Sequence, residues 1–300
     1  MQENLLYRAL SEGARKNMTD EELMDYSQKG FIPFEGEPEE AFLKRANFSD
    51  HILVDLERHL GKAIPPCPEI LSEAIVETEK IYGIAPNWVP ILFSNEKLLP
   101  WQGGAAWIFQ LEEGSPLSAL IQLREKVFSF FGTQKERVIH ELSHIGRLGF
   151  KEEKYEEFLA YLSSKSPFRR TFGPLFRSAK ESLIFASLLA LIVVFDLLLF
   201  LSGSLAWYDR FIWLKAVPLF YLGYLLIRLY IGHKRLHQTL QRLPLPLVFR
   251  LTDNEIDLFA NSSTKEIETY FREGQHLSPR RRLLYLTYLR SVATRSSQVW

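Results

Sequence analysis

The sequence contains a single cysteine, Cys67, among its 300 residues. One cysteine cannot form an internal disulfide, and a chain without disulfides is typical of a reducing compartment. A zinc site built from several thiolates is excluded for the same reason. Any metal site in this chain must therefore use histidine, aspartate or glutamate side chains.

The sequence also lacks an excess of charge of either sign, because 36 Lys and Arg balance 36 Asp and Glu. Domains that bind nucleic acid usually carry a basic excess, so the composition gives no case for a nucleic-acid partner. The first residues lack the basic and apolar regions of a signal peptide. If the protein reaches a membrane, we expect an internal segment to take it there.

Two long apolar stretches lie in the second half of the chain. Residues 182–201 hold one charged residue in twenty, and residues 211–231 form a second stretch interrupted by two basic residues and a proline. Each has about the length that a helix needs to cross a hydrocarbon layer of about 30 Å. The sequence therefore predicts a hairpin of two transmembrane helices over residues 182–231. The alternative is a pair of core helices in a soluble protein.

The flanks of the two stretches predict an orientation. The connecting residues 202–210 offer only Arg210, whereas several basic residues lie on the other side of each stretch. Because short segments rich in Lys and Arg stay in the cytoplasm, we expect an integral membrane protein with both termini cytoplasmic. The flanking basic residues are Lys165, Arg169, Arg170, Arg177 and Lys180 before the hairpin, and Lys234, Arg235 and Arg242 after it.

Asp196 is the one charged residue of the first stretch, and it lies at a depth similar to that of Lys215 in the second. A charge in hydrocarbon is costly and is usually partnered. We expect an Asp196–Lys215 pair that pins the two helices together. The alternative is a proton or substrate contact within the bilayer.

Residues 140–144 read His-Glu-Leu-Ser-His and are the stretch that predicts a specific reaction. They form an H-E-x-x-H pattern inside a helix-like run from Gln134 to Arg147. Residues four apart share one helix face, so His140 and His144 can bind one Zn²⁺ while Glu141 reaches a water on the metal. The alternative is an ordinary amphipathic helix whose histidines are held by polar neighbours.

The segment before the motif is rich in strand-like composition. Residues 88–93 and 105–110 each predict a strand, and residues 121–123 and 127–131 predict one or two more. A Gly-Thr pair then leads into the helix that carries the motif. Strands followed directly by such a helix predict a fold of the α+β class.

A third metal ligand is expected shortly after the motif. Residues 151–164 form a plausible second helix, in which Glu157 follows His144 with twelve residues between them. A helix–turn–helix of that size could fold the carboxylate back onto the metal. Glu156 or Glu153 satisfies the same spacing, so the choice among the three stays open.

In these residues the sequence resembles the gluzincin group of zinc metallopeptidases. In that group H-E-x-x-H on one helix is completed by a Glu on the next, often followed three residues on by Ala, and residues 157–160 read Glu-Phe-Leu-Ala. The resemblance covers roughly residues 86–165 and implies a zincin-like metallopeptidase domain. The zinc ligands that it implies are His140, His144 and Glu157, and the general base that it implies is Glu141.

The resemblance also bears on how a substrate meets the site. Residues 104–107 are similar to the edge strand that binds the substrate backbone in such enzymes. Tyr155, Tyr161 and Arg147 are the candidate donors of a hydrogen bond to the transition state, and the sequence does not choose among them. About sixteen residues separate the second metal-binding helix from the first apolar stretch. We therefore expect the site close to the cytoplasmic membrane surface.

Four parts are predicted along the chain. A helical region covers residues 1–85, the metallopeptidase core 86–176, the hairpin 182–231, and a C-terminal helical cytoplasmic segment 243–300. In the last part, the run Arg280-Arg281-Arg282 predicts a solvated helix start or a contact with anionic lipid rather than a nucleic-acid site.

Together these features predict a membrane-anchored zinc metallopeptidase. Its predicted partners are a lipid bilayer and a protein or peptide substrate, including membrane-associated ones. Two alternatives stay open: a non-catalytic membrane scaffold that retains a zincin-like fold, and a zinc hydrolase that acts on a non-peptide substrate. Zinc that is bound by the protein and lost in His140→Ala would favour the enzyme over the scaffold.

Overall fold

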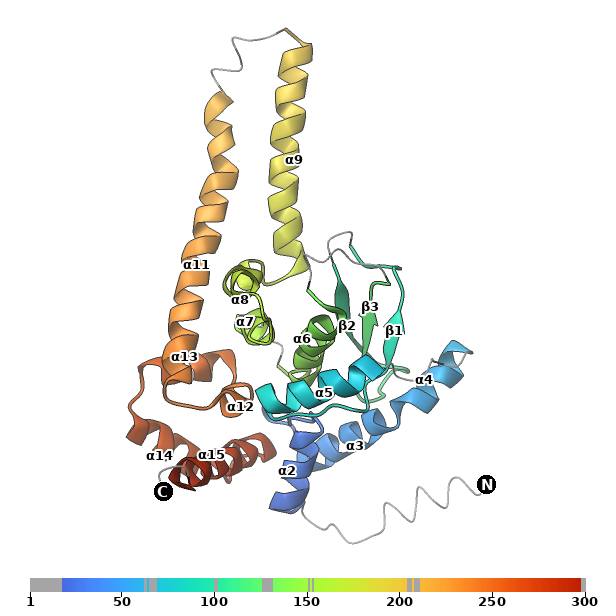
Figure 1. Cartoon of the computed structure of the whole chain (residues 1–300), viewed down its shortest axis with the longest axis vertical. Helices are drawn as coiled ribbons and strands as arrows, with labels where there is room; N and C mark the ends of the chain where they lie inside the picture. Colours follow the sequence, from blue (N-terminus) through green and yellow to red (C-terminus); the bar gives the residue numbers. More distant parts are fainter. Residues whose placement is uncertain are drawn as a thin grey trace.

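A computed structural model describes residues 18–61, 64, 69–99, 102–125, 132–150, 152, 154–203, 207 and 211–297. In these residues a small three-stranded sheet lies among helices, and two long helices project from one end of the molecule (Figure 1). The predicted α+β class is confirmed. The predicted strand over residues 127–131, the cysteine Cys67 and the alternative ligand Glu153 lie outside the described residues.

Helices come first in the described chain. Thr19 begins α2 with a capping box, in which its hydroxyl accepts a hydrogen bond from the Glu22 amide and the Glu22 carboxylate accepts one from the Thr19 amide. The helices before the sheet are α2 (Asp20–Gln28), α3 (Glu39–Asp50), α4 (Ile52–Leu60) and α5 (Glu69–Tyr82).

The sheet has the order β1-β3-β2. Its strands are β1 (Ile91–Phe93), β2 (Gly104–Phe109) and β3 (Ser118–Leu123). The central β3 pairs in parallel with β1 and antiparallel with β2, where Gly104 lies opposite Leu123. β2 is therefore an edge strand. β1 is shorter than the predicted strand over residues 88–93, and Pro90, which has no N–H to donate, directly precedes it.

The helix α6 (Gln134–Gly146), which carries the H-E-x-x-H motif, packs against β2, β3 and α5. Its buried apolar face consists of Val138, Ile139, Leu142 and Ile145. These side chains belong to one hydrophobic cluster with residues of α2, α3, α5 and the sheet, and with Phe249 in the segment after the two long helices. The motif thus lies on a helix that is fixed by the main core.

The next helix, α7 (Glu156–Tyr161), is followed by α8 (Pro167–Phe172) and the short 3-10 helix η2 (Gly173–Leu175). α7 begins later and ends earlier than the predicted helix over residues 151–164. Side-chain oxygens of Asp253 accept hydrogen bonds from the amides of Lys154 and Tyr155, so this part of the chain is held by another segment instead of continuing the helix.

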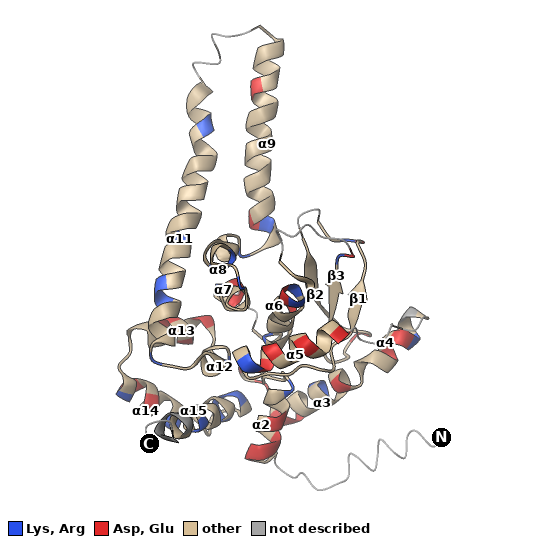
Figure 2. Cartoon of the chain, in the orientation of Figure 1, with Lys and Arg blue, Asp and Glu red and all other residues tan. Residues whose placement is uncertain are grey.

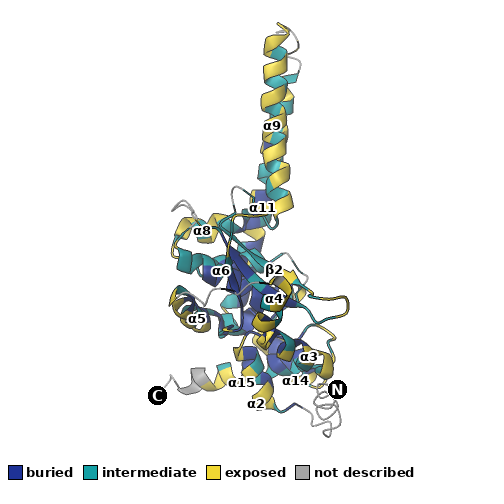
Figure 3. Ribbon diagram, turned by 90° about the vertical axis from the view of Figure 1, so that its right-hand side faces the viewer, coloured by how far each residue is buried: buried dark blue, intermediate teal, exposed yellow. Residues whose placement is uncertain are grey.

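Two helices are long and apolar enough to cross a membrane, with mean hydropathies of 2.9 and 1.5. They are α9 (Ala179–Leu201) and α11 (Ala216–Leu240), the second preceded by the 3-10 helix η3 (Ile212–Lys215). None of the residues of α9, all of which the structure describes, is buried (Figure 3). Charged residues are sparse along the projecting pair and frequent elsewhere (Figure 2). α9 is therefore not a core helix of this chain.

α11 continues to Leu240, beyond the predicted end at Ile231, because its last turns pack into the rest of the protein. Leu229 and Leu236 are buried there in a second hydrophobic cluster, together with residues of α7 and of the helices that follow. At the base of the pair, Arg228 of α11 contacts Glu181 of α9 at 2.5 Å.

The chain ends in four helices that lie at the base of α11 and beside the N-terminal helices (Figure 1). They are α12 (Leu245–Val248), α13 (Asp253–Asn261), α14 (Thr264–Gly274) and α15 (Pro279–Ser297). Residues 280–282 lie in the first turn of α15, at the predicted helix start, but the prediction that the run is solvated or contacts lipid is wrong for Arg280. Arg280 is 1% exposed and contacts Glu255 at 2.7 Å, and Arg282 contacts Asp20 of α2 at 2.5 Å. The arginines join the C-terminal helices to the N-terminal ones.

The predicted pair between Asp196 and Lys215 is confirmed, with 2.8 Å between the carboxylate and the ammonium nitrogen. We expect Asp196→Leu alone to destabilise the hairpin by about 2–3 kcal/mol, because it removes the carboxylate that balances the Lys215 charge in an apolar environment. The double variant Asp196→Leu/Lys215→Leu should recover most of that loss. Unfolding of the full chain in detergent measures both, and equal instability of the single and double variants would contradict the role of the pair.

Candidate metal centre

Two histidines on one face of α6 form the first half of the site. α6 begins at a capping box between Thr133 and Glu136, which fixes its first turn, and its apolar face is held in the core. His140 and His144 are one turn apart on the opposite side, and their Nε2 atoms are 3.2 Å from each other. Their side chains are 19% and 15% exposed, so both can be reached from a cavity.

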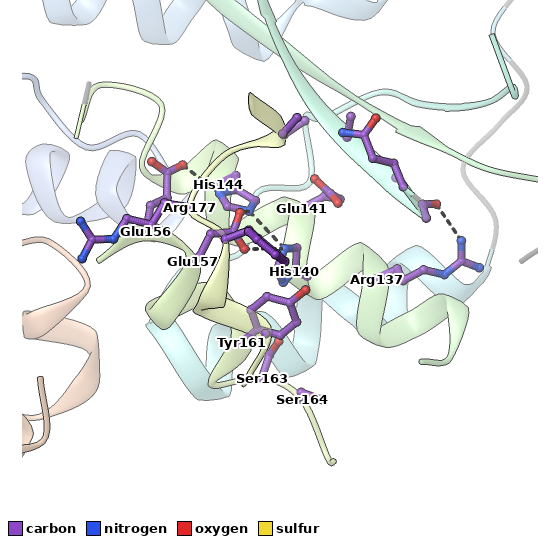
Figure 4. Close-up of a pocket in the computed structure, with 18 of the residues that line it drawn as sticks. Arg137, His140, Glu141, His144, Glu156, Glu157, Tyr161, Ser163, Ser164 and Arg177 are labelled. Atoms are coloured by element: carbon purple, nitrogen blue, oxygen red, sulfur yellow. Dashed lines mark hydrogen bonds and ion pairs between the residues drawn. The ribbon is translucent and has the colours of Figure 1, made fainter. Parts of the chain in front are cut away.

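Glu157 of α7 completes the group. Its two carboxylate oxygens lie 3.6 Å from Nε2 of His140 and 3.6 Å from Nε2 of His144. Ligand atoms of the three residues all lie within 4.8 Å of one another, and this group could hold a metal ion. Figure 4 shows the carboxylate of Glu157 pointing toward the two imidazoles.

The donor set and its spacing fit zinc. Two imidazole nitrogens and one carboxylate oxygen are common ligands of catalytic zinc sites. Atoms at about 2.0–2.1 Å from a tetrahedral zinc ion are about 3.3 Å from one another, close to the 3.2 and 3.6 Å of this group. A zinc ion held by these three donors alone would keep one position for water or substrate, as catalytic zinc sites do and structural sites do not.

Glu156 contacts a different nitrogen of His144 than Glu157 does. Its carboxylate lies 2.8 Å from Nδ1 of His144, on the side of the ring away from His140. A carboxylate in this position fixes the ring orientation and leaves Nε2 free for a metal. The spacing in the sequence left Glu156 open as an alternative to Glu157, which the resemblance implies. In the structure, the Glu157 carboxylate lies near Nε2 of both histidines and the Glu156 carboxylate lies at Nδ1 of His144.

Charges in the site depend on burial and on the carboxylates around it. Burial, and then the charge of His144, hold the pKa of His140 well below its usual value. Burial alone would lower the pKa of His144, but the hydrogen bond with Glu156 and the nearby carboxylates raise it to about 10. Burial also raises the pKa of Glu157 to about 7. Without a metal, the site therefore keeps a proton on His144.

Glu141 lies beside the histidines and faces the edge strand β2. It is 8% exposed, and burial raises its pKa against the lowering effects of His144 and of the Ala106 backbone amide. Gly104 of the same strand approaches closely, because a Cβ there would lie 3.3 Å from Oε1 of Glu141. Arg137 of α6 also donates a hydrogen bond from Nη1 to the carbonyl of Gly103, the residue before β2, at 2.9 Å.

A cavity of about 500 Å³ opens in front of these residues. Its lining includes the two histidines, Glu141, Glu156 and Glu157, residues 102–106 and Ile108 along β2, and residues 176–179 and Ser182 at the start of α9. The cavity thus extends from the edge strand across the candidate metal ligands to the first turn of a helix that is apolar enough to cross a membrane.

Of the three candidate transition-state donors, Tyr161 lines the cavity. Its ring packs edge-on against His140, with 4.6 Å between ring centroids. The Tyr155 hydroxyl instead donates to Asp257 at 2.5 Å, and Nη1 of Arg147 donates to backbone carbonyls of the C-terminal segment. Neither Tyr155 nor Arg147 lines the cavity, and these contacts anchor both side chains to the C-terminal segment.

The raised pKa values predict a pH dependence of metal binding. Since zinc binds deprotonated ligands, at pH 7 it must displace one proton from His144 and roughly half a proton from Glu157. The apparent zinc affinity is expected to rise about tenfold per pH unit above pH 7, and more steeply below it. Calorimetry between about pH 6 and about pH 8.5, in buffers of different ionisation enthalpy, measures the protons released. A zinc affinity independent of pH would contradict these protonation states.

The candidate metal centre is recognised by its own donor atoms alone. No family model, no curated protein and no solved structure matches this chain.

Proposed function

We propose that this protein is a membrane-anchored zinc metallopeptidase that hydrolyses peptide bonds at the cytoplasmic membrane surface. The observation that carries the proposal is the group of His140, His144 and Glu157, with Glu141 beside it, in one cavity bounded by an edge strand. The zincin-like fold is part of the proposal. The spacing of the three metal-donor groups and the orienting hydrogen bond from His144 to Glu156 support it.

Glu141 acts as the general base in this proposal. A zinc ion held by the three side chains would supply Lewis acidity and lower the pKa of water at its open position to about 7. The Glu141 carboxylate accepts the proton of the attacking water and then passes it to the departing amine. Its burial favours this exchange, because a raised pKa brings a carboxylate closer to neutral pH.

Tyr161 is the proposed donor to the oxyanion. Burial, together with the charges of Glu157 and Glu141, raises the pKa of its phenol, so the hydroxyl keeps its proton at neutral pH. A hydrogen-bond donor aimed at the developing negative charge stabilises the transition state more than the ground state. Its ring contact with His140 places it on the cavity side of the metal ligands.

The outer edge of β2, which pairs with no other strand in the described residues, favours a polypeptide over other substrates. The Gly103 carbonyl accepts a hydrogen bond from the Arg124 amide at 3.1 Å. Because antiparallel pairing alternates, Gly104, Ala106 and Ile108 then turn their backbone groups away from β3 and toward the cavity. An extended peptide can add to such an edge through main-chain hydrogen bonds.

The membrane side of the cavity points to substrates that are attached to a membrane. Residues 176–179 and Ser182 line it, and the apolar helix α9 begins at Ala179. If α9 crosses the bilayer with its flanking basic residues in the cytoplasm, the cavity lies at the cytoplasmic interface. A segment leaving the bilayer would reach β2 within a few residues.

Glu141→Gln tests the chemistry directly. We expect peptide hydrolysis to fall by about 10²–10⁴-fold, because the amide cannot take up the proton of the attacking water. Zinc content should stay near stoichiometric, since Glu141 is outside the ligand group. His140→Ala is the matched variant, which should lose both zinc and hydrolysis. A zinc-loaded Glu141→Gln protein that cleaves as fast as wild type would disprove the role of Glu141.

The membrane location is tested with a randomised cleavable segment that follows a membrane-spanning helix and a Gly/Ser spacer and precedes a soluble reporter, reconstituted with the protein in vesicles. With a spacer of about 5 residues we expect cleavage about twentyfold faster than with about 40, because the effective concentration of a tethered segment falls roughly as the −3/2 power of length. Mass spectrometry locates the cut. Equal rates for both spacers would count against an interfacial site, whereas cleavage of neither would count against peptidase activity.

A further inference from the structure

The helix α7 is too short to hold its own position. It has six residues, from Glu156 to Tyr161, whereas isolated helices shorter than about 12–15 residues are marginal in water. Tyr155 occupies its N-cap position and, in the described part of the chain, its side chain makes no capping hydrogen bond to the first turn. Nevertheless α7 carries both the carboxylate of the ligand group and the carboxylate that orients His144.

Asp253, at the start of α13, holds the N-terminal end of α7. Its two carboxylate oxygens accept hydrogen bonds from the backbone amides of Lys154 at 2.8 Å and Tyr155 at 3.2 Å. Asp253 is 7% exposed, and its own amide donates to the Glu152 carboxylate at 2.5 Å. Asp253, which comes after the hairpin in the sequence, thus provides the hydrogen-bond acceptors for the amides of Lys154 and Tyr155 before α7.

A second aspartate on α13 reinforces this contact. Asp257 accepts a hydrogen bond from the Tyr155 hydroxyl at 2.5 Å and pairs with the Lys154 ammonium group. The same carboxylate accepts from Arg235 of α11 at 2.9 Å. The segment before α7 is therefore fastened to α13, and α13 to the base of α11.

The C-terminal end of α7 is held from another direction. The hydroxyl of Tyr82, at the end of α5, donates to the carbonyls of Leu159 at 2.7 Å and Ala160 at 3.2 Å. Tyr82 is fully buried. On its outer face, α7 meets α11 closely, since a Cβ at Gly232 would lie 2.4 Å from the Phe158 ring. α7 is thus fixed at both ends and along one side by segments distant in sequence.

We propose that Asp253 is a positioning residue of the metal centre. By holding the amides before α7, it sets the place of Glu157 opposite the two histidines and of Glu156 on Nδ1 of His144. The inference rests on the proposed function, to which it adds that the metal centre requires the segment after the hairpin. Zinc sites tolerate deviations of about 0.2 Å in ligand distance, so a small shift of α7 suffices to weaken the site.

The experiment uses the full chain in detergent with Zn²⁺ or Co²⁺ alone as the probe. We expect Asp253→Ala to lower zinc affinity by about 10–100-fold, as loss of an orienting partner does in other metal sites. The visible spectrum of the Co²⁺-loaded protein should also change, because it reports the geometry at the metal. Asp253→Asn keeps one acceptor oxygen, so its loss of affinity should be smaller.

Ser263→Ala is the matched control. Ser263 caps α14 in the same C-terminal segment through Glu266, and its capping contacts lie within α14. This variant should keep wild-type zinc affinity and the wild-type Co²⁺ spectrum. If it loses as much affinity as Asp253→Ala, the effect is general destabilisation and the proposal is overturned.

The remaining outcomes separate this inference from the proposed function. A wild-type protein that binds no zinc would refute the metallopeptidase. A wild-type protein that binds zinc, with Asp253→Ala within about twofold of its affinity and an unchanged Co²⁺ spectrum, would refute only the positioning role. If Asp253→Ala does not fold, Asp253→Asn decides in the same way, because it preserves the shape and one acceptor of the side chain.

Discussion

The distance between α6 and α7 is the constraint on which the candidate site depends. α6 is fixed by its apolar face in the main core, so the two imidazoles have little freedom. The third donor comes from a helix of six residues that has no such face in that core. Its side chains belong to the second cluster, formed with α11 and the C-terminal helices. The ligand group therefore lies where two separately packed parts of the protein meet.

This arrangement gives the segments around the hairpin a direct physical connection to the site. The base of α11 contributes to the second cluster and holds α13 through Arg235 and Asp257. α9 begins at the edge of the cavity. In the proposed peptidase, the membrane helices both anchor the protein and form part of the surroundings of the metal ligands.

Buried arginines perform a similar joining function at the opposite end of the molecule. Arg250 donates to Ser27 and to the carbonyls of Tyr82 and Gly83, and Arg280 pairs with Glu255 and Glu35. A buried guanidinium without partners would be costly. These contacts therefore favour the one packing of the C-terminal helices against the N-terminal ones in which each arginine keeps its partners. The C-terminal segment is in this way part of the structure around the sheet.

Local patterns in the sequence were enough to predict the α+β class, the helix around His140 and His144, and the apolar pair with Asp196 opposite Lys215. These features depend on helical periodicity, caps and hydrophobic length, which are properties of neighbouring residues. The shortened α7, the different roles of Glu156 and Glu157, and the burial of Arg280 depend on contacts between residues far apart in the chain. Asp253 lies 98 residues from the amide of Tyr155 that it caps, and no local pattern predicts such a contact. The sequence thus determined which side chains could bind a metal, and the tertiary packing of α7 between Tyr82 and Asp253 decided which of them lie together.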